Sequence, residues 1–405
     1  MNNFLKINFN LIKDYLSAGL GTIFPAFFSL GSILMFSKTV GMEVFGSFVI
    51  IYSIVDLIDK VFGVSTWQAY QRFITKDNKK NLISNLFVID VFFSFCSFFF
   101  SCLIIYLYSK FYFELNNYFY LISLLGLSRA SDISIGILRA KGEYLKLSFL
   151  TTVGPLVRFI FTVIGFIYSY ELNYFISLFF IDKVISLLLK TIYLIINKSS
   201  FSLKIKRLDG VYKYLINTYF DSSLRIIPRR LDIILLSLIT TNSFIGLYQI
   251  IKDLSAMINY AYDPLYQVLY RNYKESGLKK SIYEFKKMTT FLIKISPLIL
   301  FFINFIIICF LVIYYDYNVT DVFLISTLTV IPPVVGFMSL GIAPLISIWF
   351  DVKYLRIAQI YAVFTFLLIL IFGFLFKNTT LIISAGIVYY LIWFLYTYIY
   401  VRKNE

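Results

Sequence analysis

Charged side chains interrupt the long apolar segments of this chain, and arginine is prominent among them. Arg158 lies near the middle of such a segment with no acidic residue in it, and Arg225 and Arg229 flank Pro228. A guanidinium binds a phosphate or pyrophosphate through two parallel hydrogen bonds, and a proline kink frees polar backbone groups nearby. We therefore predict an anion-binding site. Its substrate-binding candidates, led by Arg158 and Arg225, are Arg158, Arg225, Arg229, Lys60, Arg129 and Lys252.

The apolar segments contain nineteen charges in all, ten basic and nine acidic. On insertion scales each charge at a helix centre costs roughly 2.5–3.5 kcal/mol, so nineteen facing lipid would cost on the order of 50 kcal/mol. These charges must line a hydrated cavity or pair with one another. Helical spacing places them on polar stripes, such as Asp90, Ser94, Ser97 and Ser101. The nine acids are Asp56, Asp59, Asp90, Asp132, Asp182, Asp221, Asp232, Asp253 and Asp263.

Some of these charges have a purely structural interpretation. Asp56 with Lys60, and Arg129 with Asp132, stand at the spacing of salt bridges within one helix, and this role competes evenly with a functional one. Lys190 and Lys294 lie within about two turns of a predicted cytoplasmic helix end. We expect these two lysines to extend their ammonium groups to the membrane interface.

The elements that carry these residues are predicted to be transmembrane helices. Hydrophobic residues make up 60% of the chain and charged residues 15%, against about a quarter charged in soluble domains. A spanning helix needs roughly 20 apolar residues. This indicates an all-α polytopic membrane protein of about twelve helices. The predicted spans are 16–37, 45–70, 82–108, 118–138, 147–169, 173–196, 214–240, 244–269, 290–315, 320–349, 354–376 and 379–401.

Several kinds of chemistry are excluded by composition. The chain has no histidine, which rules out a histidine metal site, a Ser-His-Asp triad and a histidine proton relay. Its three cysteines, Cys96, Cys102 and Cys309, lie in apolar segments and are odd in number, which argues against a disulfide framework. We expect no metal, no cofactor and no catalytic residues.

The basic residues between the predicted spans set the orientation. With the N-terminus in the cytoplasm, 24 lysines and arginines lie on the cytoplasmic side and three on the other. This asymmetry follows the positive-inside rule and places both termini in the cytoplasm. The formal net charge of +15 therefore reflects topology and contact with anionic lipid. It does not indicate nucleic acid.

The chain is predicted to consist of two six-helix lobes around a central cavity. The lobes are 1–197 and 214–405, joined by a basic cytoplasmic linker at 198–213. A short segment recurs at an offset of 200 positions, as Phe45-Gly46-Ser47-Phe48 and as Ile245-Gly246-Leu247-Tyr248. In both copies one residue and then two isoleucines follow. The first helix of each half contains a proline, Pro25 or Pro228. Interrupted helices at matching positions are typical of a transporter's central site.

Five segments carry a resemblance to a known family. They are VGMEVFG at 40–46, GILRAKGE at 136–143, Arg230-Leu231-Asp232, Gly246-Leu247-Tyr248, and the stretch from Asp263 to Tyr270. In this order and with twelve spans, the chain resembles the Wzx-type polysaccharide-unit flippases, or O-antigen flippases, of the multidrug/oligosaccharidyl-lipid/polysaccharide exporter superfamily.

The resemblance implies a transporter that works by alternating access in the bacterial inner membrane. It would carry undecaprenyl-pyrophosphate-linked oligosaccharide units from the cytoplasmic to the periplasmic leaflet for O-antigen and lipopolysaccharide synthesis. It further implies a glycan polymerase and chain-length machinery as partners. Coupling to a proton or sodium gradient would use Asp59, Asp90 or Asp263 as the titrating group.

Two other functions compete with this one. A cation-coupled multidrug exporter of the same superfamily is the main alternative, but it should have an acid-rich cavity, whereas the charges here are at least as basic as acidic. A membrane glycan polymerase, ligase or glycosyltransferase usually carries a large external loop. The predicted outer loops are short, the longest being near 109–117 and 314–321. The sequence therefore favours a transporter over an enzyme.

Overall fold

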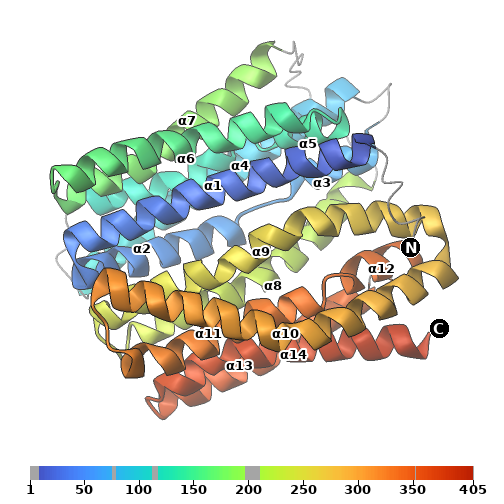
Figure 1. Ribbon diagram of the computed structural model, residues 1–405. Coiled ribbons are helices and arrows are strands. Elements are labelled where there is room, and N and C mark those ends of the chain that lie inside the picture. Colours follow the sequence, from blue (N-terminus) through green and yellow to red (C-terminus); the bar gives the residue numbers. More distant parts are fainter. Residues whose placement is uncertain (1–8, 75–78, 112–116, 197–209, 352, 405) are drawn as a thin grey trace. The chain divides into compact units, whose positions relative to one another are not determined.

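The computed structural model describes residues 9–74, 79–111, 117–196, 210–351 and 353–404. All regular secondary structure in these residues is helical (Figure 1). This confirms the predicted all-α class. The helices of the first part of the chain are α1 (Phe9–Val40), α2 (Met42–Val61), α3 (Thr66–Phe73), α4 (Lys79–Phe111), the 3₁₀ helix η1 (Asn117–Arg129), α5 (Ile133–Ala140), α6 (Tyr144–Ile167), α7 (Leu172–Ile196) and α8 (Val211–Leu236).

The second part of the chain contains longer helices. α9 and α10 have 35 and 38 residues and are separated by Gly277, whose φ of 77° lies in the left-handed region that favours glycine. The helices here are α9 (Asn242–Ser276), α10 (Leu278–Tyr315), α11 (Val319–Met338), α12 (Ile342–Trp349), α13 (Lys353–Leu375) and α14 (Thr379–Lys403).

Each predicted span coincides with one helix or with a pair of helices separated by a short break. The broken spans are α2 with α3, η1 with α5, and α11 with α12. By length and composition, seven of the described helical spans can cross a membrane, or eight if η1 and α5, bent by 41°, form one span. Four predicted spans do not meet this length and composition test. They contain α2, α7, α8 and α9, which carry most of the intramembrane charges. The chain is a multi-pass membrane protein.

The helix boundaries agree with the internal repeat. α2 begins at Met42 and α9 at Asn242, the same offset of 200 as the matching segments. Phe48 and Tyr248 are both buried, as are the isoleucine pairs that follow them. The fourth and tenth spans, six apart, are both broken helices. The two halves therefore share local structure as well as sequence pattern.

The chain divides into two compact units within α8. The N-terminal unit is Phe27–Ile234, and the C-terminal unit is Met1–Ala26 with Leu235–Glu405. The predicted lobes placed α8 in the second half, and most of the predicted 198–213 linker lies outside the described residues. α8 belongs mainly to the N-terminal unit because Val211 and Leu215 pack into its apolar cluster. The predicted lobe boundaries therefore stay a prediction.

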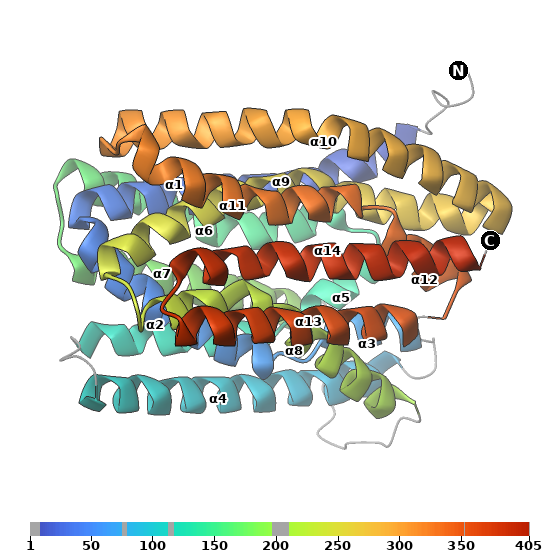
Figure 2. The ribbon, with the colours of Figure 1, turned by 90° about the horizontal axis from the view of Figure 1, so that it is seen from below.

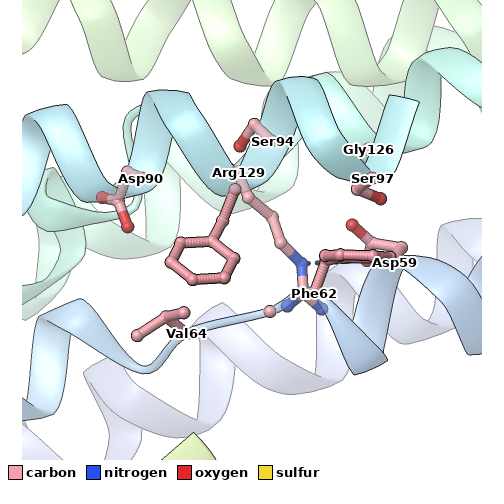
Figure 3. A pocket seen from close by; sticks show the side chains of 10 residues that line it. Asp59, Phe62, Val64, Asp90, Ser94, Ser97, Gly126 and Arg129 are labelled. Carbon is pink, nitrogen blue, oxygen red and sulfur yellow. Dashed lines mark ion pairs between the residues drawn. The ribbon is translucent and has the colours of Figure 1, made fainter. Parts of the chain in front are cut away.

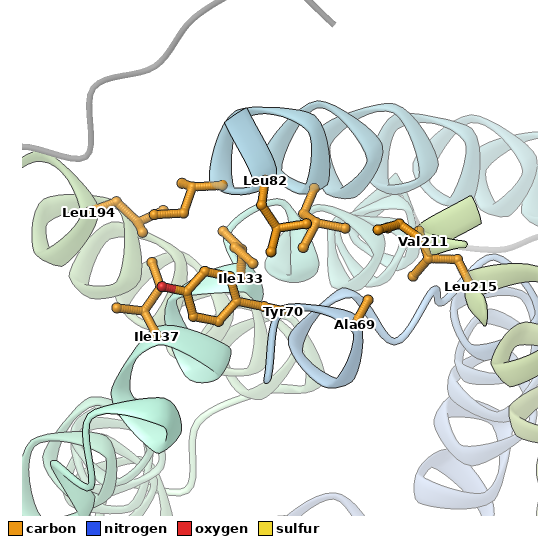
Figure 4. Close-up of a cluster of buried hydrophobic side chains, with 10 residues drawn as sticks. Ala69, Tyr70, Leu82, Ile133, Ile137, Leu194, Val211 and Leu215 are labelled. Atoms are coloured by element: carbon orange, nitrogen blue, oxygen red, sulfur yellow. The ribbon is translucent and has the colours of Figure 1, made fainter. Parts of the chain in front are cut away.

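The N-terminal unit is packed around an apolar cluster that fixes its short helices. α3 and α5 each have only eight residues, too few to be stable alone. Within the unit α3 contacts α5 and α4, and α6 runs beside α7 (Figure 1). The buried cluster consists of Ala69, Tyr70, Leu82, Ile83, Leu86, Ile133, Ile137, Leu194, Val211 and Leu215 (Figure 4).

The C-terminal unit has its own apolar cluster around the short helix α12. α13 and α14 lie side by side (Figure 2). Trp349 donates from Nε1 to the carbonyl of Tyr273 at 3.1 Å and to Ser281 Oγ at 3.2 Å, which ties α12 to the α9–α10 turn. The buried members are Tyr273, Phe285, Val335, Ile342, Leu345, Ile346, Leu355, Phe394 and Val401.

Replacing Gly136 by alanine should destabilise the N-terminal unit. An added Cβ would lie 2.9 Å from Trp67 Cα, so the α3 backbone would have to move away from α5. Overpacking of this kind costs about 1–3 kcal/mol. We expect Gly136→Ala to lower the thermal unfolding midpoint of the purified protein in detergent. Gly386→Ala is the matched control, because its Cβ would meet Pro332 Cγ at an ordinary 3.5 Å. Equal midpoints for the two variants would contradict the close packing of α3 on α5.

Candidate functional site

Four aspartates in the N-terminal unit form ion pairs between different parts of the helical bundle. In each pair a carboxylate oxygen lies 2.6–2.8 Å from a basic nitrogen, the distance expected of strong ion pairs. Three of the ion pairs join one helix to another, and the fourth joins the turn before α5 to helix α7. The pairs are Asp56 with Arg230, Asp59 with Arg129, Asp132 with Lys190, and Asp182 with Arg158.

The salt bridges predicted within single helices are wrong. Asp56 bonds to Arg230 of α8 instead of Lys60, and Asp132 bonds to Lys190 of α7 instead of Arg129. Lys60 lies 3.7 Å from its neighbour Asp59. Both carboxylates reach a cation on another helix, with Asp56 Oδ2 2.7 Å from Arg230 Nε and Asp132 Oδ1 2.6 Å from Lys190 Nζ.

Lys190 also departs from its prediction. It is only 8% exposed, and its Nζ donates to Asp132 Oδ1 at 2.6 Å and to the Ser128 carbonyl at 3.4 Å. The ammonium therefore points into the protein and does not extend to the interface. Lys294 of α10 is exposed, so interface contact by that side chain stays a prediction.

Arg158 is enclosed in the structure. It is 4% exposed, its Nη1 donates to Asp182 Oδ2 at 2.8 Å, and its guanidinium lies 4.4 Å from the centre of the Phe179 ring. Lys183 is 3.5 Å from the same carboxylate. The partner Asp182 is on α7, which is why Arg158 looked unaccompanied in its own segment. In this conformation its charge is neutralised, and its predicted contact with substrate would need the pair to open.

A small polar pocket lies between α2, α4 and η1 of the N-terminal unit. Figure 3 shows Asp90 and Asp59 on opposite sides of it, with Ser94 of α4 and the Arg129 side chain between them. A Cβ on Gly63 would collide with the Arg129 guanidinium, so a glycine is needed where the arginine crosses the α2 break. The lining residues are Asp59, Phe62, Gly63, Val64, Asp90, Phe93, Ser94, Ser97, Gly126 and Arg129.

Asp90 differs from the four paired aspartates. It is 5% exposed and accepts hydrogen bonds from Thr66 Oγ1 at 2.6 Å and from the Ile133 backbone N–H at 2.9 Å. Among the described residues no cation forms an ion pair with it. The polar helix face predicted from sequence included Asp90, Ser94 and Ser97, but Thr66 was not identified as a partner of Asp90. The available signal was Gly63 followed by Ser65 and Thr66, small and hydroxylated residues typical of a helix break and restart.

The remaining candidates lie elsewhere. Arg225 and Arg229 are exposed on α8, one turn apart, with Pro228 between them. Lys252 is on α9 in the C-terminal unit, partly exposed, with its Nζ 5.5 Å from the centre of the Tyr248 ring. The side chain of Asp263 lies outside the described residues. The structure thus brings Lys60, Arg129 and Asp59 together in the N-terminal unit and leaves Arg158 in a separate pair.

Comparisons with known proteins identify the fold. No protein-family model and no curated sequence matches the chain. Among solved structures, the lipid II flippase MurJ in an inward closed conformation is similar with a TM-score of 0.70 and 17% identity, over 95% of this chain and 87% of that chain. An outward-facing multidrug resistance MATE family transporter of the MOP superfamily has a TM-score of 0.69 and 13% identity, over 97% and 95% of the two chains.

A third solved structure is also similar to this chain. It is a MOP superfamily transporter from Pyrococcus furiosus, with a TM-score of 0.65 and 12% identity over 97% of this chain and 95% of that chain. It is described as having a binding pocket of reversed polarity that suggests a different function. The chain therefore has the fold of the MOP superfamily transporters.

Replacing one partner of the buried Arg158–Asp182 pair should destabilise the protein more than replacing both partners. A lone buried charge costs about 3–5 kcal/mol, whereas replacing both partners by apolar residues is often neutral. We expect Arg158→Met and Asp182→Leu each to lower the thermal unfolding midpoint in detergent, and the double variant to recover most of it. The exposed pair Lys280–Glu284, at 4.0 Å, is the control and should change stability by about 0–1 kcal/mol. A double variant as unstable as either single variant would contradict the pairing.

Proposed function

We propose that the chain is a flippase that carries undecaprenyl-pyrophosphate-linked oligosaccharide units from the cytoplasmic to the periplasmic leaflet of a bacterial inner membrane by alternating access. The fold supports a transporter, since its structural neighbours include a lipid II flippase as well as multidrug transporters. The choice of substrate rests on charge and on the resemblance to the O-antigen flippases.

The observation that carries the proposal is the exposure of Arg225 and Arg229 on α8. Their side chains are exposed, whereas Arg129, Arg158, Lys190 and Arg230 each lie within 2.6–2.8 Å of an aspartate oxygen. Two guanidinium groups one turn apart on one helix face can each give a bidentate contact to a phosphate. A lipid-linked pyrophosphate presents two such groups, while its polyprenyl chain can stay in lipid.

A cation-coupled multidrug exporter is the second candidate, because MATE transporters share the fold at comparable TM-scores. A site for cationic drugs should present acids to the ligand. Here the four paired aspartates are bonded to cations and the exposed face of α8 carries arginines. Charge therefore favours an anionic substrate.

The rest of the proposal follows from the sequence. The excess of basic residues between the spans supports cytoplasmic termini. A glycan polymerase and chain-length machinery would use the flipped unit in O-antigen and lipopolysaccharide synthesis. Asp59, Asp90 and Asp263 remain the candidates for coupling to an ion gradient, and Lys60, Arg129 and Lys252 remain secondary substrate contacts.

Reconstitution into liposomes tests the proposal. The substrate would be a fluorescent undecaprenyl-pyrophosphate oligosaccharide, and flipping would be measured as its exposure to an impermeant quencher. Loss of a charged hydrogen bond costs roughly 1.5–3 kcal/mol, so the Arg225→Ala/Arg229→Ala double variant should flip about tenfold more slowly or worse. Its unfolding midpoint should stay near that of the unmodified protein.

Lys280→Ala is the control, because Lys280 is an exposed cation on a different helix, α10. It should flip at the unmodified rate. Normal flipping by the α8 double variant would remove these arginines from the site. Transport of a cationic dye with no flipping of the lipid-linked oligosaccharide would support the multidrug alternative and overturn the proposal.

A further inference from the structure

Two broken spans of the N-terminal unit are joined at a single carboxylate. α2 ends at Val61 and α3 begins at Thr66, while η1 ends at Arg129 and α5 begins at Ile133. Asp90, on the continuous helix α4, accepts from the hydroxyl of Thr66 on one oxygen and from the backbone N–H of Ile133 on the other. It therefore contacts the first residue of both short helices. The N-terminal ends of helices favour a negative charge, so the ionised carboxylate suits this place.

Asp90 is also set apart by its electrostatic surroundings. From α2 the pocket receives Asp59, and from η1 it receives Arg129, which is bonded to Asp59. The turn between η1 and α5 carries Asp132, which is bonded to Lys190 of α7. On α3, Tyr70 lies in the apolar cluster and Arg72 is exposed. The nearby cations thus have other partners. A buried carboxylate without its own cation is the one that most readily accepts a proton.

The pocket contains further polar atoms that suit water. Ser94 and Ser97 of α4 are 3% and 1% exposed. Their hydroxyl groups, and Oδ1 of Asp59, make no hydrogen bond to any described residue although all three residues line the pocket with Asp90. Buried polar groups are normally satisfied by protein or by ordered water. These hydroxyl groups would therefore suit a water molecule beside Asp90.

We propose that Asp90 is the proton-binding carboxyl of this chain and that the pocket supplies the proton. A hydronium ion in the pocket transfers a proton to the carboxylate oxygen that faces Thr66, forming an O–H bond and leaving water. The proton goes to this oxygen because the Thr66 hydroxyl can turn and accept a hydrogen bond, whereas the Ile133 N–H can only donate. Neutralisation weakens the bond to Ile133 and so loosens the joint between α3 and α5.

This inference deepens the proposed function, because it names the proton as the coupling ion. It also selects Asp90 over the other candidate in the same pocket. Asp59 lies 2.8 Å from Arg129 and 3.7 Å from Lys60, so it already has cationic partners, whereas Asp90 forms no ion pair with any described residue. A proton bound at Asp90 would change the contacts of two helix breaks at once.

Infrared difference spectroscopy of the full-length protein in lipid bilayers tests the inference. Acidification should produce the C=O stretching band of a protonated carboxylic acid. The band should be absent in Asp90→Asn and present in the matched variant Asp59→Asn. Thr66→Val, which removes only the hydroxyl partner, should keep the band and shift its frequency.

Three results would overturn the inference: a band that persists in Asp90→Asn, a band lost only in Asp59→Asn, or a Thr66→Val spectrum identical to the unmodified one. Suppression of the band by sodium at constant pH would also overturn it, because the pocket would then bind a metal cation. The measurement uses no substrate. A negative result therefore leaves the flippase proposal intact, and failure to flip the lipid-linked oligosaccharide leaves the spectrum unaffected.

Discussion

Ionised side chains inside a membrane protein need an opposite charge, hydrogen bonds or water close by. In the described N-terminal unit the partner of most aspartates is a cation from another helix. The electrostatic cost of a lone charge at this depth exceeds what packing can offset. In the N-terminal unit the pairing involves α2, η1, α6, α7 and α8. Three of these helices, α2, α7 and α8, are not among the described helices that qualify as membrane spans by length and composition. Their charged faces are turned into contacts that hold them to their neighbours.

The same constraint separates structural charges from functional ones. A guanidinium bonded to a buried aspartate, as in Arg158, stabilises the bundle and offers little to a ligand. The guanidinium of Arg225, by contrast, lies on an exposed helix face. Asp90 is the intermediate case, since it is buried yet satisfied by a hydroxyl and a backbone N–H.

Much of the fold could be predicted from sequence because it depends on local pattern. Apolar length located the twelve helical segments, and the offset of 200 positions between α2 and α9 follows from matching residues in the chain itself. The ion pairs could not be predicted in this way. Asp56 and Arg230 are separated by 174 positions, and nothing in either segment indicates which distant charge will face it.

Only the part of the site that depends on local helical pattern could be predicted from the sequence. The polar stripe on α4 follows from helical periodicity, so Asp90, Ser94 and Ser97 were identified before their surroundings were known. The role of Thr66 depends on two helix breaks that meet in space. The pairing of Arg158 with Asp182 depends on the neighbouring helix α7. Tertiary contacts of this kind decide whether a charge is available, and sequence spacing within one helix cannot report them.

Exchanging the charges of Asp56 and Arg230 tests most directly whether cross-helix neutralisation holds the N-terminal unit together. Their atoms Oδ2 and Nε lie 2.7 Å apart, and the pair joins α2 to α8. In membranes isolated from cells that express each variant, the yield of folded protein would be measured by size-exclusion chromatography in detergent. Asp56→Arg and Arg230→Asp should each lose folded protein, and the double exchange should restore it. Full yield from either single reversal, or no recovery in the double exchange, would contradict cross-helix neutralisation.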